Sequence, residues 1–233
     1  MGSAEPGTTR RYDSTGRQAQ VVATRRRIVE AAVQKFVAGG YGSTSIADIA
    51  KAAGVSAPTV YASFAGKADL LKAAIDFSLA GDDAPIPVAQ RPRSVWVHQA
   101  DTAEELVARW AVLAGELTGR AGLIYDVLIR AADAAPDLRP LLADMERQRH
   151  NAISVLVDEI RKRGGLPDGR SVAEARDVTW VCTDPSHFVF LTVRRRWSRK
   201  RYVEWIRNAL TKLVIEPDST PPPESANRQS TGA

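Results

Sequence analysis

The chain has 233 residues, 44% of them hydrophobic and 25% charged, with a formal net charge of +5 and a single cysteine, Cys182. One cysteine excludes an internal disulfide, and no Cys/His group has metal-binding spacing, so buried apolar side chains must stabilise the fold. No stretch approaches the roughly 18 apolar residues that a membrane span needs, and the basic N-terminus has no apolar signal region. These features predict a reduced, cytoplasmic globular protein with no membrane partner.

The positive charge is concentrated in the first third of the chain. Residues 1–80 contain ten Lys or Arg and six Asp or Glu, whereas residues 81–233 contain 22 and 21. A basic excess confined to one segment indicates an acidic partner for that segment, such as DNA.

Apolar residues recur at helical spacing through most of residues 24–215, and no segment shows the alternation typical of strands. The sequence therefore predicts an all-α fold. Residues 1–23 are rich in Gly, Ser, Thr and Arg and are expected to form a disordered basic arm. Residues 216–233 contain three consecutive prolines and are expected to form a disordered tail.

The first predicted helix covers about residues 24–37 and ends at the glycines 39–40, which readily adopt the left-handed C-cap conformation. The second begins after Ser45, with Asp48 three residues later as a variant of the capping box. Gly54 is expected to end this second helix.

The segment from Ser45 to Tyr61 is predicted to be two short helices joined by a tight turn. The small residue Ala50 precedes the turn glycine Gly54 by four positions, and the aliphatic Val60 follows it by six. This is the spacing of a helix-turn-helix, whose second helix enters the major groove of DNA. A helical hairpin in an ordinary all-α core has the same spacing and is the alternative.

The surface of the second of these helices favours the DNA-binding interpretation. Close approach to base edges requires small side chains, whereas a solvated face more often carries Lys and Glu. The exposed positions are small or polar: Ser56, Ala57, Thr59, Ala62 and Ser63. A further helix is predicted over residues 67–79, which completes a helix-turn-helix domain over residues 24–80.

Prolines in residues 81–98 are expected to break helices, so this segment is predicted to be a linker. Long helical patterns resume over residues 99–215, which are predicted to form a second, helical-bundle domain. The clearest helices of that domain cover residues 138–160 and about 198–213.

From residue 24 to about residue 75 the chain resembles the DNA-binding domain of the TetR family of bacterial transcriptional regulators. The matching residues are Ile28, Ala31, Ala32, Phe36, Gly40, Tyr41, Thr44, Ser45, Asp48, Ile49, Ala50, Ala53, Gly54, Val55, Ser56, Thr59, Val60, Tyr61, Phe64, Lys67, Leu70 and Leu71. The sequence departs from the family pattern at Ala62 and Ser63, where the family often has an aromatic residue and a histidine.

The resemblance implies particular contacts with double-stranded DNA. Thr44 and Ser45 would present hydroxyl and backbone N–H groups to a phosphate, and Tyr61 and Lys67 would contact the sugar–phosphate backbone. The residues that would face the bases are Ser56, Ala57 and Thr59.

Arg25, Arg26 and Arg27 lie at the start of the domain. We include Arg25 among the expected DNA-binding residues, because a basic cluster just before such a domain can contact the DNA backbone or minor groove. A solvated leader is the alternative for the cluster. Tyr41 is expected in the core, with a backbone contact as its alternative.

The resemblance also implies that residues 99–215 bind a ligand and dimerise through the last two helices. Two recognition helices about 34–36 Å apart could then bind the two halves of a palindrome. Large residues that could line a pocket for an unknown small-molecule effector are Trp110, Tyr125, Met145, Trp180 and Phe188. The alternative, which helical spacing favours for aromatic and Met side chains, is that they belong to the core.

We therefore expect a sequence-specific transcriptional regulator: a ligand-responsive repressor that binds a palindromic operator as a homodimer. The alternative is a non-specific or architectural DNA-binding protein without a small-molecule effector. No P-loop, dinucleotide fingerprint, zinc-protease motif or nucleophile–base set is present in the sequence, so we expect no enzyme activity, cofactor or metal.

Overall fold

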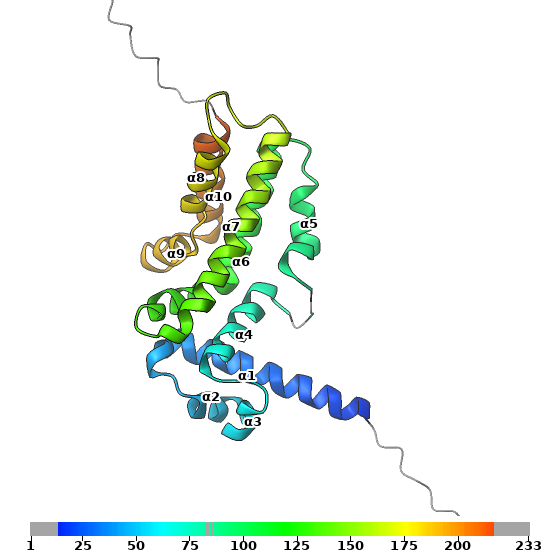
Figure 1. Cartoon of the computed structure of the whole chain (residues 1–233), viewed down its shortest axis with the longest axis vertical. Helices are drawn as coiled ribbons and strands as arrows, with labels where there is room; N and C mark the ends of the chain where they lie inside the picture. Colours follow the sequence, from blue (N-terminus) through cyan, green and yellow to red (C-terminus); the bar gives the residue numbers. More distant parts are fainter. Residues whose placement is uncertain (1–13, 83, 85, 217–233) are drawn as a thin grey trace, which may run out of the picture.

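The computed structural model describes residues 14–82, 84 and 86–216, and these residues form helices and no strand. The predicted all-α class is confirmed. Figure 1 shows the N-terminal helices at one end of the molecule, with the remaining helices packed beyond them. Within the described residues, every helix is too short or too polar to cross a membrane.

The N-terminal helices are α1 (Ser14–Ser43), α2 (Ile46–Ala53), α3 (Ala57–Tyr61) and α4 (Lys67–Ala80). The last three agree with the sequence-based prediction. The helical conformation of α1 is interrupted at Gly40, where φ is 78° and ψ is 170°.

The predicted disordered arm is wrong for residues 14–23, because α1 begins at Ser14. The first turns of α1 project away from the other helices (Figure 1), and Val21 and Val22 are 54% and 51% exposed. A helical segment whose side chains stay largely exposed needs no apolar periodicity, so the sequence pattern did not predict a helix here. Residues 1–13 of the predicted arm lie outside the described residues.

The remaining helices follow α4 in chain order. They are η1 (Val88–Gln90), α5 (Pro92–His98), α6 (Ala103–Ala132), η2 (Pro136–Leu138), α7 (Arg139–Lys162), α8 (Val172–Cys182), α9 (Pro185–Phe188), the π-helical η3 (Val189–Arg194), α10 (Arg199–Leu210) and the π-helical η4 (Thr211–Ile215). The helices predicted over 138–160 and 198–213 are confirmed by α7 and by α10 with η4.

The predicted linker over residues 81–98 is not irregular throughout, since η1 and α5 lie within it. Pro92 is the first residue of α5, where a missing N–H group costs nothing, so this proline starts a helix instead of breaking one. The predicted tail over residues 216–233 lies outside the described residues except for Glu216.

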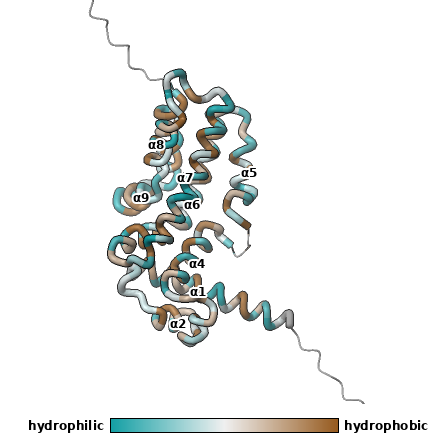
Figure 2. The backbone as a smooth tube through the Cα atoms, in the orientation of Figure 1, coloured by the Kyte–Doolittle hydropathy of each residue, from teal (hydrophilic) through white to brown (hydrophobic). Residues whose placement is uncertain are grey.

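The buried apolar residues form two clusters that do not coincide with the two predicted domains. The first cluster contains α1–α4 together with α6 residues from Ala121 onwards and Met145 of α7. The second contains the earlier part of α6 and most of the C-terminal helices. Figure 2 shows brown and teal alternating along the helices, as expected where each helix has one buried face. The long helix α6 therefore belongs to both cores and connects the two ends of the molecule.

Close packing of α10 against α6 depends on Gly115. A Cβ atom at this position would overlap Cγ2 of Val203 on α10. The absent side chain lets the two backbones approach, which brings the C-terminal helices α8–α10 onto the side of α6 and α7 opposite α5 (Figure 1).

Candidate nucleic-acid interface and adjoining cavity

Local hydrogen bonds fix the start and the end of α2. Ser45 Oγ accepts from the Asp48 backbone N–H at 3.1 Å, and the Asp48 carboxylate accepts from the Ser45 N–H at 3.1 Å. Hydrogen bonds from the Ser45 hydroxyl and N–H hold the pKa of the Asp48 carboxyl below its usual value. Gly54 ends α2 with φ 66°, a left-handed conformation that a Cβ would strain. The predicted capping box and turn glycine are both confirmed.

The short helix α3 presents a small, mostly polar surface. Its buried residue Val60 is 0% exposed and anchors the helix to the core. Ser56 caps α3, because its Oγ accepts from the Thr59 backbone N–H at 3.3 Å and lies 2.8 Å from Thr59 Oγ1. Ser56 and Tyr61 are exposed, and Ala57 and Thr59 are half-buried. All four predicted α3 contact residues are thus brought together.

The orientation of the Thr44 side chain differs from the prediction that its hydroxyl faces a phosphate. The residue is 5% exposed, and its Oγ1 donates toward the backbone carbonyls of Gly40 (2.8 Å) and Lys35 (3.2 Å). These carbonyls lie near the break in α1, where intrahelical partners end and other donors are needed. The buried Thr44 hydroxyl therefore stabilises the last turns of α1 by donating to these carbonyls.

Lys67 lies at the start of α4 and contacts Tyr41. Its Nζ donates to the Tyr41 carbonyl at 3.0 Å and lies 4.2 Å from the centroid of the Tyr41 ring. An ammonium group has three donors, so this bond leaves two for a phosphate. The Tyr41 side chain is 7% exposed and stacks on Phe36, which confirms its expected place in the core.

Arg25 connects α1 to the residues that follow α3. Its Nη1 donates to the Ser63 carbonyl at 2.7 Å, and its Cζ lies 4.2 Å from the centroid of the Phe64 ring. Arg26 instead pairs with Glu30 one turn further along α1, at 2.8 Å. Arg25 therefore holds a positive charge beside α3.

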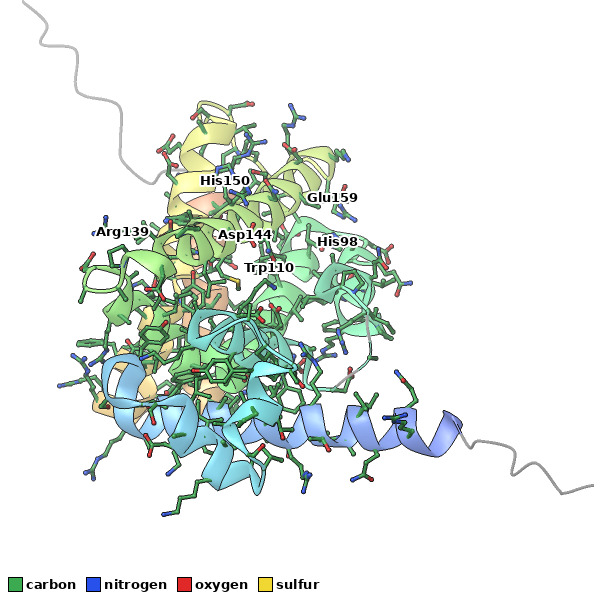
Figure 3. All side chains as sticks on the ribbon, turned by 60° about the horizontal axis from the view of Figure 1, so that its bottom comes forward. His98, Trp110, Arg139, Asp144, His150 and Glu159 are labelled. Carbon is green, nitrogen blue, oxygen red and sulfur yellow. The ribbon has the colours of Figure 1, made fainter. Side chains whose placement is uncertain are left out.

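A cavity of about 1130 Å³ adjoins this domain. Its wall is formed by residues of α1, α4, α5, α6 and α7, by the segment between α4 and α5, and by Thr183 and Pro185 at the start of α9. Figure 3 labels Trp110 in the middle of the molecule, with His98 nearby, and both residues line the cavity. Known ligand pockets occupy about 300–1,000 Å³, so this space is large enough for a small molecule.

Some of the residues predicted to line a ligand pocket do line this cavity. Phe188 does not line it and packs edge-to-face on Tyr202, with ring centroids 5.3 Å apart. Trp180 is also outside the lining and lies against Arg149, whose Cζ is 3.2 Å from its ring centroid. The predicted residues that do line the cavity are Trp110, Tyr125 and Met145.

The sequence-based set missed Arg149, a charged residue in the cavity wall whose side chain is 16% exposed. One signal was available: Arg149 follows Met145 by four residues and precedes Ile153 by four, which places it on the apolar face of α7. A charge at a core-facing position of an amphipathic helix is uncommon and indicates a specific partner.

The family model described as "Bacterial regulatory proteins, tetR family" matches residues 28–74. No curated protein sequence matches the chain. Several solved structures share its fold. MexZ of Pseudomonas aeruginosa, described as a key repressor responsible for antibiotic resistance, is 23% identical with a TM-score of 0.59, over 84% of this chain and 96% of MexZ.

Two further structures were solved with ligands. A putative transcriptional regulator from Saccharomonospora viridis, in complex with choline, is 20% identical with a TM-score of 0.64, over 84% of this chain and 100% of its own. FadR from Bacillus subtilis, in complex with stearoyl-CoA, is 19% identical with a TM-score of 0.61, over 81% and 97%. At these identities the likeness shows the fold.

The helix-turn-helix geometry lies inside the segment that the family model matches, and most of the described chain has the fold of the solved regulators. Members of this family are DNA-binding transcription factors, in agreement with the prediction that the chain is not an enzyme. Residues 28–74 therefore form a DNA-binding domain of the TetR family of bacterial transcriptional regulators.

Proposed function

We propose that this regulator is a repressor that binds a palindromic operator as a homodimer and leaves it when a small molecule fills the cavity. The single observation that carries the proposal is the shared wall between the two sites. Val29 of α1 and Phe77 of α4 line the cavity and also pack in the core that supports α2 and α3. A ligand in the cavity therefore contacts helices of the DNA-binding domain directly.

A second contact supports coupling between the cavity and the DNA-binding domain. Arg120 of α6 donates to the carbonyls of Leu79 (2.7 Å) and Ser78 (3.3 Å) at the end of α4. These carbonyls belong to the last turn of α4, which has no intrahelical donors for them. A shift of α6 would therefore be transmitted to α4 through the Arg120 guanidinium. A ligand changes DNA affinity only to the extent that it binds the two arrangements unequally.

Base recognition is assigned to α3 and backbone contact to its neighbours. The Ser56 and Thr59 hydroxyls share one hydrogen bond, which leaves one donor and several acceptor sites for base edges. Tyr61, 58% exposed, and Lys67 would contact phosphates on the flanks of α3.

Dimerisation is assigned to the C-terminal helices. Large apolar side chains are exposed on α8, η3 and η4: Val181 (60%), Phe190 (51%), Val193 (53%) and Leu213 (50%). Exposed apolar surface of this kind favours association with a second protein surface. A two-fold pair would present two α3 helices to successive turns of the major groove.

Competition binding tests the proposal. A palindrome from DNA flanking the gene and a random duplex of equal length should compete for the protein at one fixed salt concentration. We expect the palindrome to bind at least a thousandfold more tightly. Equal competition would instead support the non-specific, architectural alternative. Sedimentation of the free protein should give a dimer, and a monomer on the operator would contradict the two-fold arrangement.

A further inference from the structure

The cavity contains one deeply placed positive charge that the DNA-binding function does not use. Arg149 lies on α7 with its side chain 16% exposed, and burial lowers the pKa of its guanidinium. Taking a cation out of water costs several kcal/mol unless an anion and further hydrogen bonds compensate it. How well the protein compensates the Arg149 charge therefore determines whether the cavity favours an anionic ligand.

The protein compensates this charge incompletely. Arg149 Nη1 donates to the Trp180 carbonyl at 2.9 Å, and Nη2 lies 3.4 Å from Asp184 Oδ2. Charge-assisted bonds are ordinarily about 2.7–2.9 Å long, so the contact with Asp184 is weak. The other Asp184 oxygen, Oδ1, caps α9 by accepting from the Ser186 N–H (2.8 Å) and hydroxyl (2.5 Å). Within the described residues, Arg149 Nε is buried without a hydrogen-bond partner.

The charges at the outer rim of the cavity are paired with other protein groups. Asp82 pairs with Arg91 at 2.7 Å, and Asp76 pairs with Lys72 at 2.6 Å. Arg25 is held by the Ser63 carbonyl. The Ser63 carbonyl is neutral, so Arg25 keeps its positive charge at the rim, and this charge has the same sign as that of Arg149.

Neutral hydrogen-bond donors also lie in the cavity wall, with Tyr125 at the Arg149 end and Trp110 at the other end of the α6 lining. Burial raises the pKa of Tyr125 to about 12, while the charge of Arg149 opposes this rise, so the phenol is a donor at neutral pH. Trp110 Nε1 is buried and, in the part of the chain that the structure describes, has no acceptor. At the Arg149 end of the cavity, the phenol and the guanidinium favour an acidic group over a cationic one.

The lining also indicates an elongated ligand. Along α6 it extends from Trp110 to Tyr125, and fifteen residues of helix rise about 22 Å. Most side chains between these ends are apolar or small, including Leu113, Leu117 and Ala121. A long apolar chain would fill this length while its acidic end reaches Arg149.

We propose that the cavity binds an elongated apolar molecule with one carboxylate, of the class of long-chain carboxylic acids, and that Arg149 with Tyr125 holds the carboxylate. This inference rests on the proposed function for the idea that the cavity is a ligand site. The carboxylate of the acid adds a second anionic partner for the guanidinium beside the weak Asp184 contact. Its chain lies along α6 toward Trp110.

Calorimetric titration of the full-length protein tests the class of ligand. Hexadecanoic acid below its micelle concentration should bind about tenfold to a hundredfold more tightly than its methyl ester or hexadecan-1-ol, because hydrogen bonds to charged groups are the stronger ones. Equal binding of acid, ester and alcohol would overturn the proposal. So would tighter binding of hexadecyltrimethylammonium or of a compact polycyclic acid.

Two matched variants locate the head group. Arg149→Gln should remove the preference for acid over ester. Arg176→Gln should keep it, since Arg176 is partly buried and its Nε has no hydrogen-bond partner among the described residues, but it does not line the cavity. If Arg149→Gln fails to fold, Tyr125→Phe should still reduce the preference. Retention of the full preference in every cavity variant that folds would overturn the assignment.

The same titrations separate this inference from the proposed function. Tight, acid-selective binding that leaves operator affinity unchanged would support the ligand class and contradict the ligand-responsive repressor. Release from the operator by a cationic or uncharged compound alone would support the repressor and contradict the ligand class.

Discussion

The hydroxyl of Tyr41 donates to Asp137 Oδ2 at 2.8 Å, across 96 residues of sequence. Tyr41 belongs to the helix-turn-helix domain, whereas Asp137 lies in η2, in the turn between α6 and α7. The carbonyl and ring of the same tyrosine hold Lys67, a predicted phosphate contact. One residue thus connects the DNA-binding surface to the turn between two helices that line the cavity.

Tyr41→Phe should lower the free energy of unfolding by roughly 1 kcal/mol, the usual net contribution of one hydrogen bond. The ring still packs on Phe36, so only the bond to Asp137 is lost. Urea denaturation measures the change. Asp137→Asn is the control, since it keeps an acceptor oxygen and should cost less. An unchanged midpoint for Tyr41→Phe would show that this contact contributes nothing to stability.

Lys67→Ala should weaken binding to all DNA sequences and reduce the slope of log K against log salt by about one unit. The reason is the loss of one charged phosphate contact. The control is Lys162→Ala, which removes the same charge from the far end of α7. Fluorescence anisotropy at several salt concentrations gives both slopes. A change in base preference, with the slope unaltered, would assign Lys67 a different role.

Thr59→Ala should alter base preference at one position of each half-site, because it removes both the hydroxyl and the methyl group from α3. Thr59→Val keeps a methyl group and removes only the hydroxyl that lies 2.8 Å from Ser56 Oγ. Selection from a randomised duplex library compares the two variants. Preferences identical to those of the wild type in both would remove Thr59 from the base-contacting set.

Buried tyrosines should make the protein sensitive to alkali. Burial raises the pKa values of Tyr125 and Tyr202 to about 12, above the value near 10 of an unfolded chain. Between these values the folded state binds more protons, so stability is fully present below about pH 10 and falls toward pH 12. The slope is at most about 1.4 kcal/mol per pH unit for each phenol. Denaturation at stepped pH measures it, and Tyr125→Phe should flatten the curve.

Gly115→Ala should destabilise the protein by roughly 1–3 kcal/mol, the usual cost of overpacking a core. The added methyl would overlap Val203 Cγ2 and separate α10 from α6. Val203→Ala in the same chain should restore much of the loss, so the two changes should not be additive. Thermal melting of the single and double variants measures this coupling. Simple additivity would mean that the two residues do not restrict each other.

The sequence by itself determined the helix-turn-helix. Its elements depend on contacts between residues no more than a few positions apart: the Ser45–Asp48 capping box, the left-handed Gly54 and the Ser56 cap. Such interactions are readable from spacing, because a helix start or stop is decided within one turn. The same local rules found α4, α7 and α10.

Only the tertiary structure decided the cavity and its charge. Helical periodicity identifies the buried face of α7, but it does not say whether that face meets another side chain or an open space. Arg149, the inward hydroxyl of Thr44 and the Tyr41–Asp137 bond all depend on which distant segments meet. These long-range contacts result from packing over the whole chain, to which many weak interactions contribute. They therefore cannot be predicted from any single stretch of the sequence.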